Sequence, residues 1–301
     1  MNKKIFQYHQ ESCEKGFVYY PSPTLEKMSE LVLNVRQPGG VIGGKLSNLC
    51  SYLIVRGLYG WFREADYANA KRDFFCAAKA AILSNKAYVE PTYSFDNVLF
   101  FLLSDSEEII TWLAQDVGSL YGESSSKKWR NLVNEPHYHK FNLFLALQKK
   151  WELLAVRSAF ALAEGGSKKL SVVHTLYPFY LALANGDTSG MREAILEIIS
   201  PKRLHKQNQS VSPQSRFYLS AWGTIFAKIA MRNGYDLEIN SPWIPRECLP
   251  IQPLIGYETP YDFLNVDIFT EYEGWAKPFS PKRPGEAWFD LELGSDPTKE
   301  K

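Results

Sequence analysis

The stretch Leu176-Tyr-Pro-Phe-Tyr-Leu-Ala-Leu-Ala-Asn-Gly-Asp-Thr-Ser-Gly-Met-Arg-Glu-Ala-Ile-Leu-Glu-Ile-Ile199 decides the fold. On both sides of a polar break, its apolar residues recur at intervals of three and four, the spacing of one buried helical face. The break Asn185-Gly-Asp187 supplies a glycine that tolerates a left-handed helix end and an aspartate that can cap the next helix. The stretch therefore predicts two helices joined by a tight turn.

The same helical spacing recurs elsewhere and predicts an all-α fold with more than half of the residues in helices. Further helices are expected near 24–36 and 45–60, separated by a break at Pro38 to Gly44. Ser104 and Asp105 begin two overlapping capping boxes that end at Glu107 and Glu108. The three further stripes are Phe74, Ala77, Ala78, Ala81 and Ile82; Trp151, Leu154, Ala155, Ser158, Ala159 and Leu162; and Trp222, Ile225, Phe226, Ile229 and Ala230.

Related helix pairs suggest how these helices are organised. Leu145-Ala-Leu147 and Leu181-Ala-Leu183 lie 36 residues apart, close to the period of tetratricopeptide arrays, although most signature residues of that repeat are absent. We therefore predict stacked antiparallel helical hairpins. From Asn240 onward, frequent prolines favour an irregular segment. The expected divisions are 1–44, an N-terminal helical segment and loop; 45–239, the hairpin body; and 240–301, a Pro-rich aromatic segment packed on that body.

Composition limits the classes of partner. The 301 residues carry a net charge of +1 with 34 Lys and Arg, so no global charge favours nucleic acid or an anionic membrane. The N-terminus lacks the apolar stretch of a secretory signal, and the four cysteines form no CxxC pair. A cytoplasmic protein with free thiols is the simplest expectation.

Motifs that would indicate chemistry are incomplete. Gly39, Gly44 and Lys45 match part of a P-loop, but Leu46 stands where Ser or Thr should bind magnesium. His137 and His139 lack a third ligand at a useful spacing, and there is no G-x-S-x-G motif. We therefore expect no catalytic residue, cofactor or metal, and a binding protein rather than an enzyme.

Charge is segregated along the sequence. Residues 87–126 and 247–276 contain no Lys, Arg or His, although both stretches hold several acids. In the second stretch aromatic rings alternate with carboxylates, a combination suited to gripping a basic protein, although rings over a core with acids facing water would give the same pattern. The expected binding residues are Asp105, Glu107, Glu108, Glu258, Tyr261, Asp262, Asp267, Glu271, Tyr272, Glu273 and Trp275.

Four motifs in the second half resemble those of a known family: Phe179-Tyr-Leu-Ala-Leu-Ala-Asn-Gly-Asp187, Ile225-Phe-Ala-Lys-Ile-Ala-Met-Arg-Asn-Gly-Tyr-Asp236, Asn240-Ser-Pro-Trp-Ile-Pro-Arg-Glu-Cys-Leu-Pro250 and Tyr257-Glu-Thr-Pro-Tyr-Asp-Phe-Leu264. They are similar to the bacterial immunity protein 49 family, which accompanies polymorphic and contact-dependent toxin systems. The resemblance covers about residues 45–265. It implies a mostly α-helical antidote without catalytic residues.

The expected function is neutralisation of a cognate bacterial toxin by direct stoichiometric binding in the cytosol. The partner would be a protein toxin, such as a basic nuclease or one that attacks a nucleotide cofactor, and neither nucleic acid nor membrane is an expected partner. Such systems include those that use type VI secretion in interbacterial competition. The alternative from another class is a helical-repeat scaffold or regulator that binds another protein or a peptide.

Overall fold

The computed structural model describes residues 3–37, 41–86, 95–120, 133, 136–164, 174–204 and 213–269. About 72% of this described part is helical and none of it is in a strand, so the all-α prediction is confirmed. The chain forms two compact units, and the divisions expected from the sequence stay a prediction. Unit 1 comprises Met1–Gly16, Leu113–Val117 and Ser125–Gln252, and unit 2 comprises Phe17–Trp112, Gly118–Ser124 and Pro253–Lys301.

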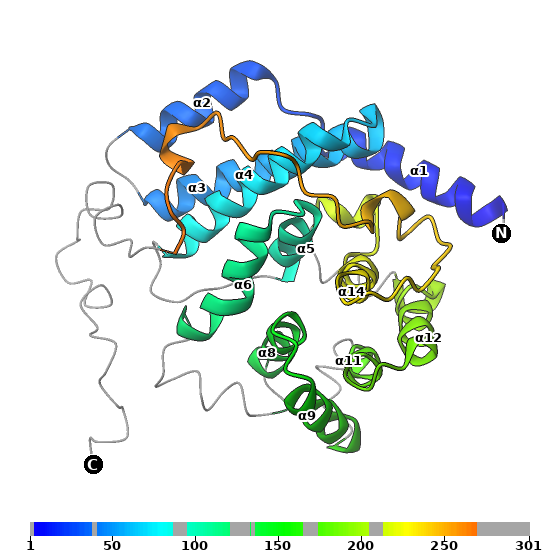
Figure 1. Ribbon diagram of the computed structural model, residues 1–301. Coiled ribbons are helices and arrows are strands. Elements are labelled where there is room, and N and C mark those ends of the chain that lie inside the picture. Colours follow the sequence, from blue (N-terminus) through cyan, green and yellow to red (C-terminus); the bar gives the residue numbers. More distant parts are fainter. Residues whose placement is uncertain are drawn as a thin grey trace, which may run out of the picture. The chain divides into compact units, whose positions relative to one another are not determined.

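Unit 2 is built around a pair of long helices, α3 and α4, which run side by side (Figure 1). Their close approach depends on Gly57 of α3, because a β-carbon there would lie 2.5 Å from the Phe74 ring of α4. The predicted stripe of α4 is fully buried. The helical elements are α2 (Leu25–Arg36), α3 (Ile42–Tyr59), the π-helical turn η1 (Gly60–Glu64), α4 (Tyr67–Lys86), α5 (Phe95–Leu103), α6 (Glu107–Leu120), of which Leu113–Val117 belongs to unit 1, and η5 (Asp262–Leu264).

In unit 1, α8 packs on α9, α9 on α11, α11 on α12, and α12 on α14. The turn between α11 and α12 is the predicted one, since Gly186 has φ +67° and Asp187 Oδ1 accepts a hydrogen bond from Gly190 N at 3.0 Å. The tetratricopeptide-like regularity of the stack stays a prediction. The elements are α1 (Lys3–Tyr19), α8 (Pro136–Leu147), α9 (Trp151–Glu164), α11 (Tyr177–Ala184), α12 (Thr188–Ile198), η3 (Ser215–Phe217), α14 (Ala221–Arg232) and η4 (Arg246–Cys248).

The orientation of α9 differs from the predicted one. Its buried residues are Leu154, Arg157, Ser158 and Ala161, whereas Ala159 and Leu162 of the predicted stripe are exposed. Arg157 lies at the centre of the buried face. Its guanidinium lies 3.9 Å from the centroid of the Tyr138 ring, and its Nε donates to Asn142 Oδ1 at 2.7 Å. Because apolar residues occupy several sides of α9, their spacing alone could not identify the buried face.

Two helix starts also differ from the predicted ones. Helix α3 begins at Ile42 rather than near residue 45, so the lysine of the incomplete P-loop lies within a helix, where Lys45 Nζ donates to Gln37 O at 2.8 Å. The residue before α6 is Ser106, whose hydroxyl accepts from Ile109 N at 3.5 Å. Asp105 therefore does not cap α6, because its carboxylate is used elsewhere.

Within the described ranges, no helix combines the length and the apolar character that crossing a membrane requires. The proline-rich region after α14 contributes to both units. In unit 1, the buried Lys228 of α14 donates to Cys248 O and Pro250 O, each at 2.9 Å. In unit 2, the segment 257–268, orange in Figure 1, lies along α3 and α4.

Candidate interaction surface

Asp105, the first of the predicted binding acids, is buried. Its backbone is left-handed, with φ +56°, a conformation that aspartate tolerates better than most residues. Its Oδ2 lies 2.8 Å from Lys71 Nζ of α4, and the two side chains are 0% and 8% exposed. A side chain without exposure cannot touch the surface of a partner, so we exclude Asp105 from the proposed surface. Its observed contact is internal to unit 2.

Glu107 and Glu108 begin α6, where negative charge stabilises the helix dipole. Glu107 is exposed. Glu108 is 38% exposed and lies 3.3 Å from Lys79 of α4, which also donates to Val266 O at 3.1 Å. A cation thus already faces Glu108, whereas the surface position of Glu107 suits an intermolecular contact.

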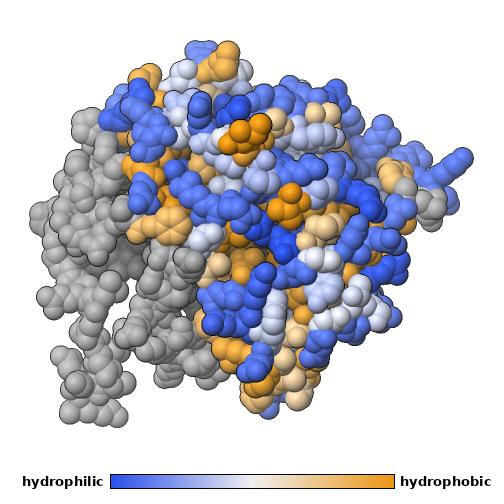
Figure 2. Space-filling view, viewed as in Figure 1, coloured by the Kyte–Doolittle hydropathy of each residue, from blue (hydrophilic) through white to orange (hydrophobic). Residues whose placement is uncertain are grey.

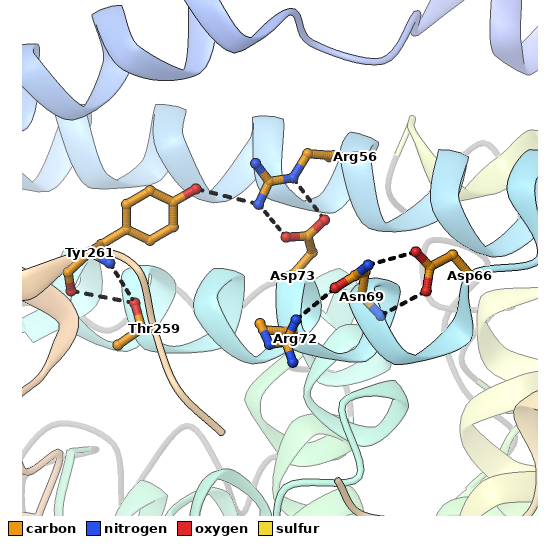
Figure 3. A network of polar contacts seen from close by, with 7 residues as sticks. All are labelled: Arg56, Asp66, Asn69, Arg72, Asp73, Thr259 and Tyr261. Carbon is orange, nitrogen blue, oxygen red and sulfur yellow. Dashed lines mark hydrogen bonds and ion pairs between the residues drawn. The ribbon is translucent and has the colours of Figure 1, made fainter. Parts of the chain in front are cut away.

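Tyr261, predicted as an aromatic anchor, belongs to a polar network on α3 and α4 (Figure 3). Arg56 holds Asp73 with two hydrogen bonds, and its Nη2 also donates to the Tyr261 hydroxyl at 3.4 Å. Tyr261 N in turn donates to Thr259 Oγ1 at 3.1 Å. Burial raises the pKa of the Tyr261 phenol, which is therefore neutral at physiological pH. This ring fixes the C-terminal segment on α3 and presents little surface to a partner.

Residues 87–126 and 247–276, which contain no Lys, Arg or His, are called the two base-free stretches. The remaining described acids of the second base-free stretch are exposed. Asp262 Oδ1 lies 2.7 Å from Arg36 Nη2 at the end of α2. Asp267 Oδ1 accepts a hydrogen bond from Phe269 N at 2.9 Å, and Asp267 is exposed. Glu258 follows Tyr257, whose hydroxyl donates to Ser104 O at 2.5 Å. These contacts bring residues of the two base-free stretches together within unit 2. The other predicted residues, Glu271, Tyr272, Glu273 and Trp275, lie outside the described residues.

Segregation of charge along the sequence is therefore not segregation in space. Asp105, Glu108 and Asp262 each face a cation that α2 or α4 supplies. The fold brings these cations to the acids from outside the base-free stretches. We keep three exposed residues, Glu107, Glu258 and Asp267, in the proposed acidic surface; Asp262 is also exposed, but its carboxylate lies beside Arg36.

Unit 1 contains a buried cluster of aromatic and titratable residues between α8, α9 and α11. The Tyr177 hydroxyl is hydrogen-bonded to His139 Nδ1, and the rings of His139 and His174 lie 6.4 Å apart. Burial, with His174 and Arg157 nearby, lowers the pKa of His139 to about 3. Among the described residues, no three His, Cys, Asp or Glu side chains are grouped as metal ligands would be.

Two surface features of unit 1 were not predicted from the sequence. The first is an exposed apolar set on α9, Leu153, Val156 and Phe160, with Val156 67% exposed. Figure 2 shows apolar surface at the lower end of the view, where Figure 1 places α9. The second feature is a groove along α1. The apolar and basic residues of α1 could have indicated a binding face. The groove itself could not be predicted, because its other wall comes from residues distant in the sequence.

Comparison with known proteins gives a match to a protein family. The model of a family described as immunity protein 49 matches residues 128–248. Neither the curated proteins nor the solved structures gave a match to the chain. The matched segment lies within the longest part of unit 1, Ser125–Gln252, and includes α8, α9, α11, α12 and α14. The predicted resemblance of this chain to the immunity protein 49 family is thus confirmed over residues 128–248.

Proposed function

We propose that this chain is an immunity protein that neutralises a cognate bacterial toxin by direct, stoichiometric binding in the cytosol. The family match over residues 128–248 carries the proposal. The match extends over helices of one compact unit rather than over a single motif. Function by binding requires a stable surface, and the buried core of these helices provides a rigid support for one.

The proposed partner is a toxin with a cationic surface, such as a nuclease or an enzyme that attacks a nucleotide cofactor. Substrates of such toxins are anionic, and clefts that hold them tend to be basic. Glu107, Glu258 and Asp267 of unit 2 are the carboxylates proposed to meet this surface. Exposed charges of this kind mainly increase the rate of association, whereas buried apolar anchors contribute more to affinity.

Co-expression with a candidate toxin, encoded beside the gene for this chain, tests the proposal. The toxin is induced in a sensitive bacterium with and without the full chain, and growth is followed over time. We expect the chain to restore growth against this toxin and to give no protection against an unrelated toxin of similar activity. The unrelated toxin controls for general effects of expression.

The result is interpretable only when the chain is soluble and abundant, so its level is measured in the same cells. Continued growth arrest in the presence of abundant soluble chain would contradict the proposed function. Protection against both toxins would indicate a general effect rather than neutralisation of a cognate partner.

A further inference from the structure

A groove of about 890 Å³ lies within unit 1, between α1 on one side and the end of α12 with the residues after it, η3 and residues 240–243 on the other. Tyr8 of α1, Leu196 of α12 and Trp243 are among its apolar and aromatic lining residues. Its volume is in the range of sites that hold several side chains or a small ligand. The family-matched segment supplies all of the lining except the residues of α1.

Helix α1 is attached to the rest of unit 1 along one side only. His9 Nε2 donates to Tyr218 O at 2.7 Å, and the His9 ring meets Trp243 edge to face at 4.9 Å. Gly16 is the only fully buried residue of α1, and a β-carbon there would lie 2.7 Å from the Tyr218 ring. Tyr8 lies on the groove side of α1, where its ring centroid is 6.0 Å from that of Trp243, and it is still 59% exposed.

The charge of the groove has one sign. Lys4, Lys15 and Arg216 line it, and no Asp or Glu is among its described lining residues. This contrasts with the net charge of +1 of a chain in which acids and bases are nearly equal in number. A ligand that complements the groove therefore carries negative charge together with apolar groups.

The arrangement of the cations indicates the length of that ligand. Lys4, Tyr8, Ser12 and Lys15 are spaced by three or four residues and form one stripe of α1. The stripe has a lysine at each end, and eleven residues of helix separate these ends by about 16 Å. A polypeptide covers this distance with about eleven helical residues or about five extended ones. A segment of protein can meet both lysines while its apolar side chains fill the space between them.

We propose that this groove is the docking site for an acidic segment of the cognate toxin, with carboxylates near both ends and apolar side chains between them. The segment lies along α1 in the manner of a helix or strand bound in a groove. This inference rests on the proposed function and names a part of the interface. It assigns to unit 1 a binding surface of opposite charge to the acids of unit 2.

The test is surface plasmon resonance of the full chain against the purified toxin encoded by the neighbouring gene. The double variant Lys4→Glu/Lys15→Glu reverses both ends of the stripe, and each lysine is exposed. Lys150→Glu/Arg192→Glu is the matched control, because it makes the same change of net charge at exposed positions of unit 1 outside the groove. A third variant, Tyr8→Ala, removes an exposed apolar contact. Circular dichroism and thermal unfolding establish that each variant is folded.

We expect the double variant to bind at least tenfold more weakly than the control, with a smaller difference at high salt, and Tyr8→Ala to weaken binding at either salt concentration. If the wild-type chain binds the toxin and the double variant matches the control, the groove proposal is wrong while the proposed function stands. If the wild-type chain does not bind the toxin, the proposed function fails and this inference fails with it. Light scattering measures self-association of each variant. If the variants that bind the toxin more weakly also lose self-association of the chain, a second copy of the chain occupies the groove, and this result also overturns the proposal.

Discussion

Lys71 and Asp105 form a buried ion pair in unit 2, with 2.8 Å between Nζ and Oδ2. The pair joins α4 to the turn before α6, and neither side chain is exposed enough to be solvated by water. Removal of one member of such a pair leaves the other charge buried without compensation, which is far costlier than loss of a surface ion pair.

The first prediction follows from this pair. We expect Asp105→Asn to lower the free energy of unfolding by about 3–5 kcal/mol. Urea denaturation measures the change, and Glu107→Gln, two residues away but exposed, is the control and should change it by no more than about 1 kcal/mol, the size of a helix-dipole contribution. Equal effects of the two substitutions would mean that the pair does not stabilise unit 2.

The second prediction concerns Arg157, which lies at the centre of the buried face of α9. Arg157→Ala removes a cation–π contact with Tyr138 and leaves the buried Asn142 Oδ1 without this donor, so we expect a loss of about 3 kcal/mol in unfolding free energy. Val156→Ala alters the exposed face of the same helix and should cost less than about 1 kcal/mol. Thermal or urea unfolding of both variants gives the comparison, and similar costs would contradict the assigned role of Arg157.

The third prediction is a pH dependence that originates from His139. Its pKa falls from the ordinary 6.5 to about 3 on folding, so between these values the unfolded chain binds a proton that the folded chain does not. Stability should therefore decrease as pH falls through this window, by about 1.4 kcal/mol per pH unit from this group. Above 6.5 the imidazole is neutral in both states and contributes no pH dependence.

His139→Gln tests this assignment. The variant loses its bond to Tyr177 and is expected to be less stable than the parent at neutral pH. The difference in unfolding free energy between parent and variant should narrow at acid pH. Only the parent then bears the cost of keeping an imidazole neutral in the folded state. Urea unfolding at about pH 7.5 and about pH 4.5 measures this difference, and a difference of the same size at both would assign the titration to other groups.

Much of the fold could be predicted from the sequence, because its signals are local. The Asn185–Asp187 turn and the buried stripes of α4 and α14 depend on residues close together in the chain. The buried face of α9 could not be predicted, because the contact that decides it joins Arg157 to Tyr138 and Asn142 of another helix.

The candidate surface was harder to predict for the same reason. The acids of residues 87–126 and 247–276 stand together in the sequence, but the cations beside three of them come from α2 and α4. Lys71 lies 34 residues before Asp105, and Arg36 lies 226 residues before Asp262. No pattern within either stretch contains this information. The family match, in contrast, depends on sequence alone and was predicted from its motifs.

The fourth prediction concerns the exposed acids of unit 2. We expect Glu107→Lys/Glu258→Lys/Asp267→Lys to retain the fold and to slow association with a basic toxin, most strongly at low salt. Surface plasmon resonance at two salt concentrations separates the association rate from the dissociation rate. Glu26→Lys/Glu193→Lys/Glu238→Lys is the control, because it changes net charge equally at exposed positions elsewhere. Association as fast as that of the control at both concentrations would place the interface elsewhere.

The central claim is that this chain neutralises its toxin by binding it directly. Isothermal titration calorimetry of the full chain with the purified toxin encoded by the neighbouring gene tests it most directly. The account predicts one toxin per chain and a Kd of about 1 nM or below, a binding free energy of about −12 kcal/mol or stronger. Absence of binding, or a Kd weaker than about 1 μM, would contradict it.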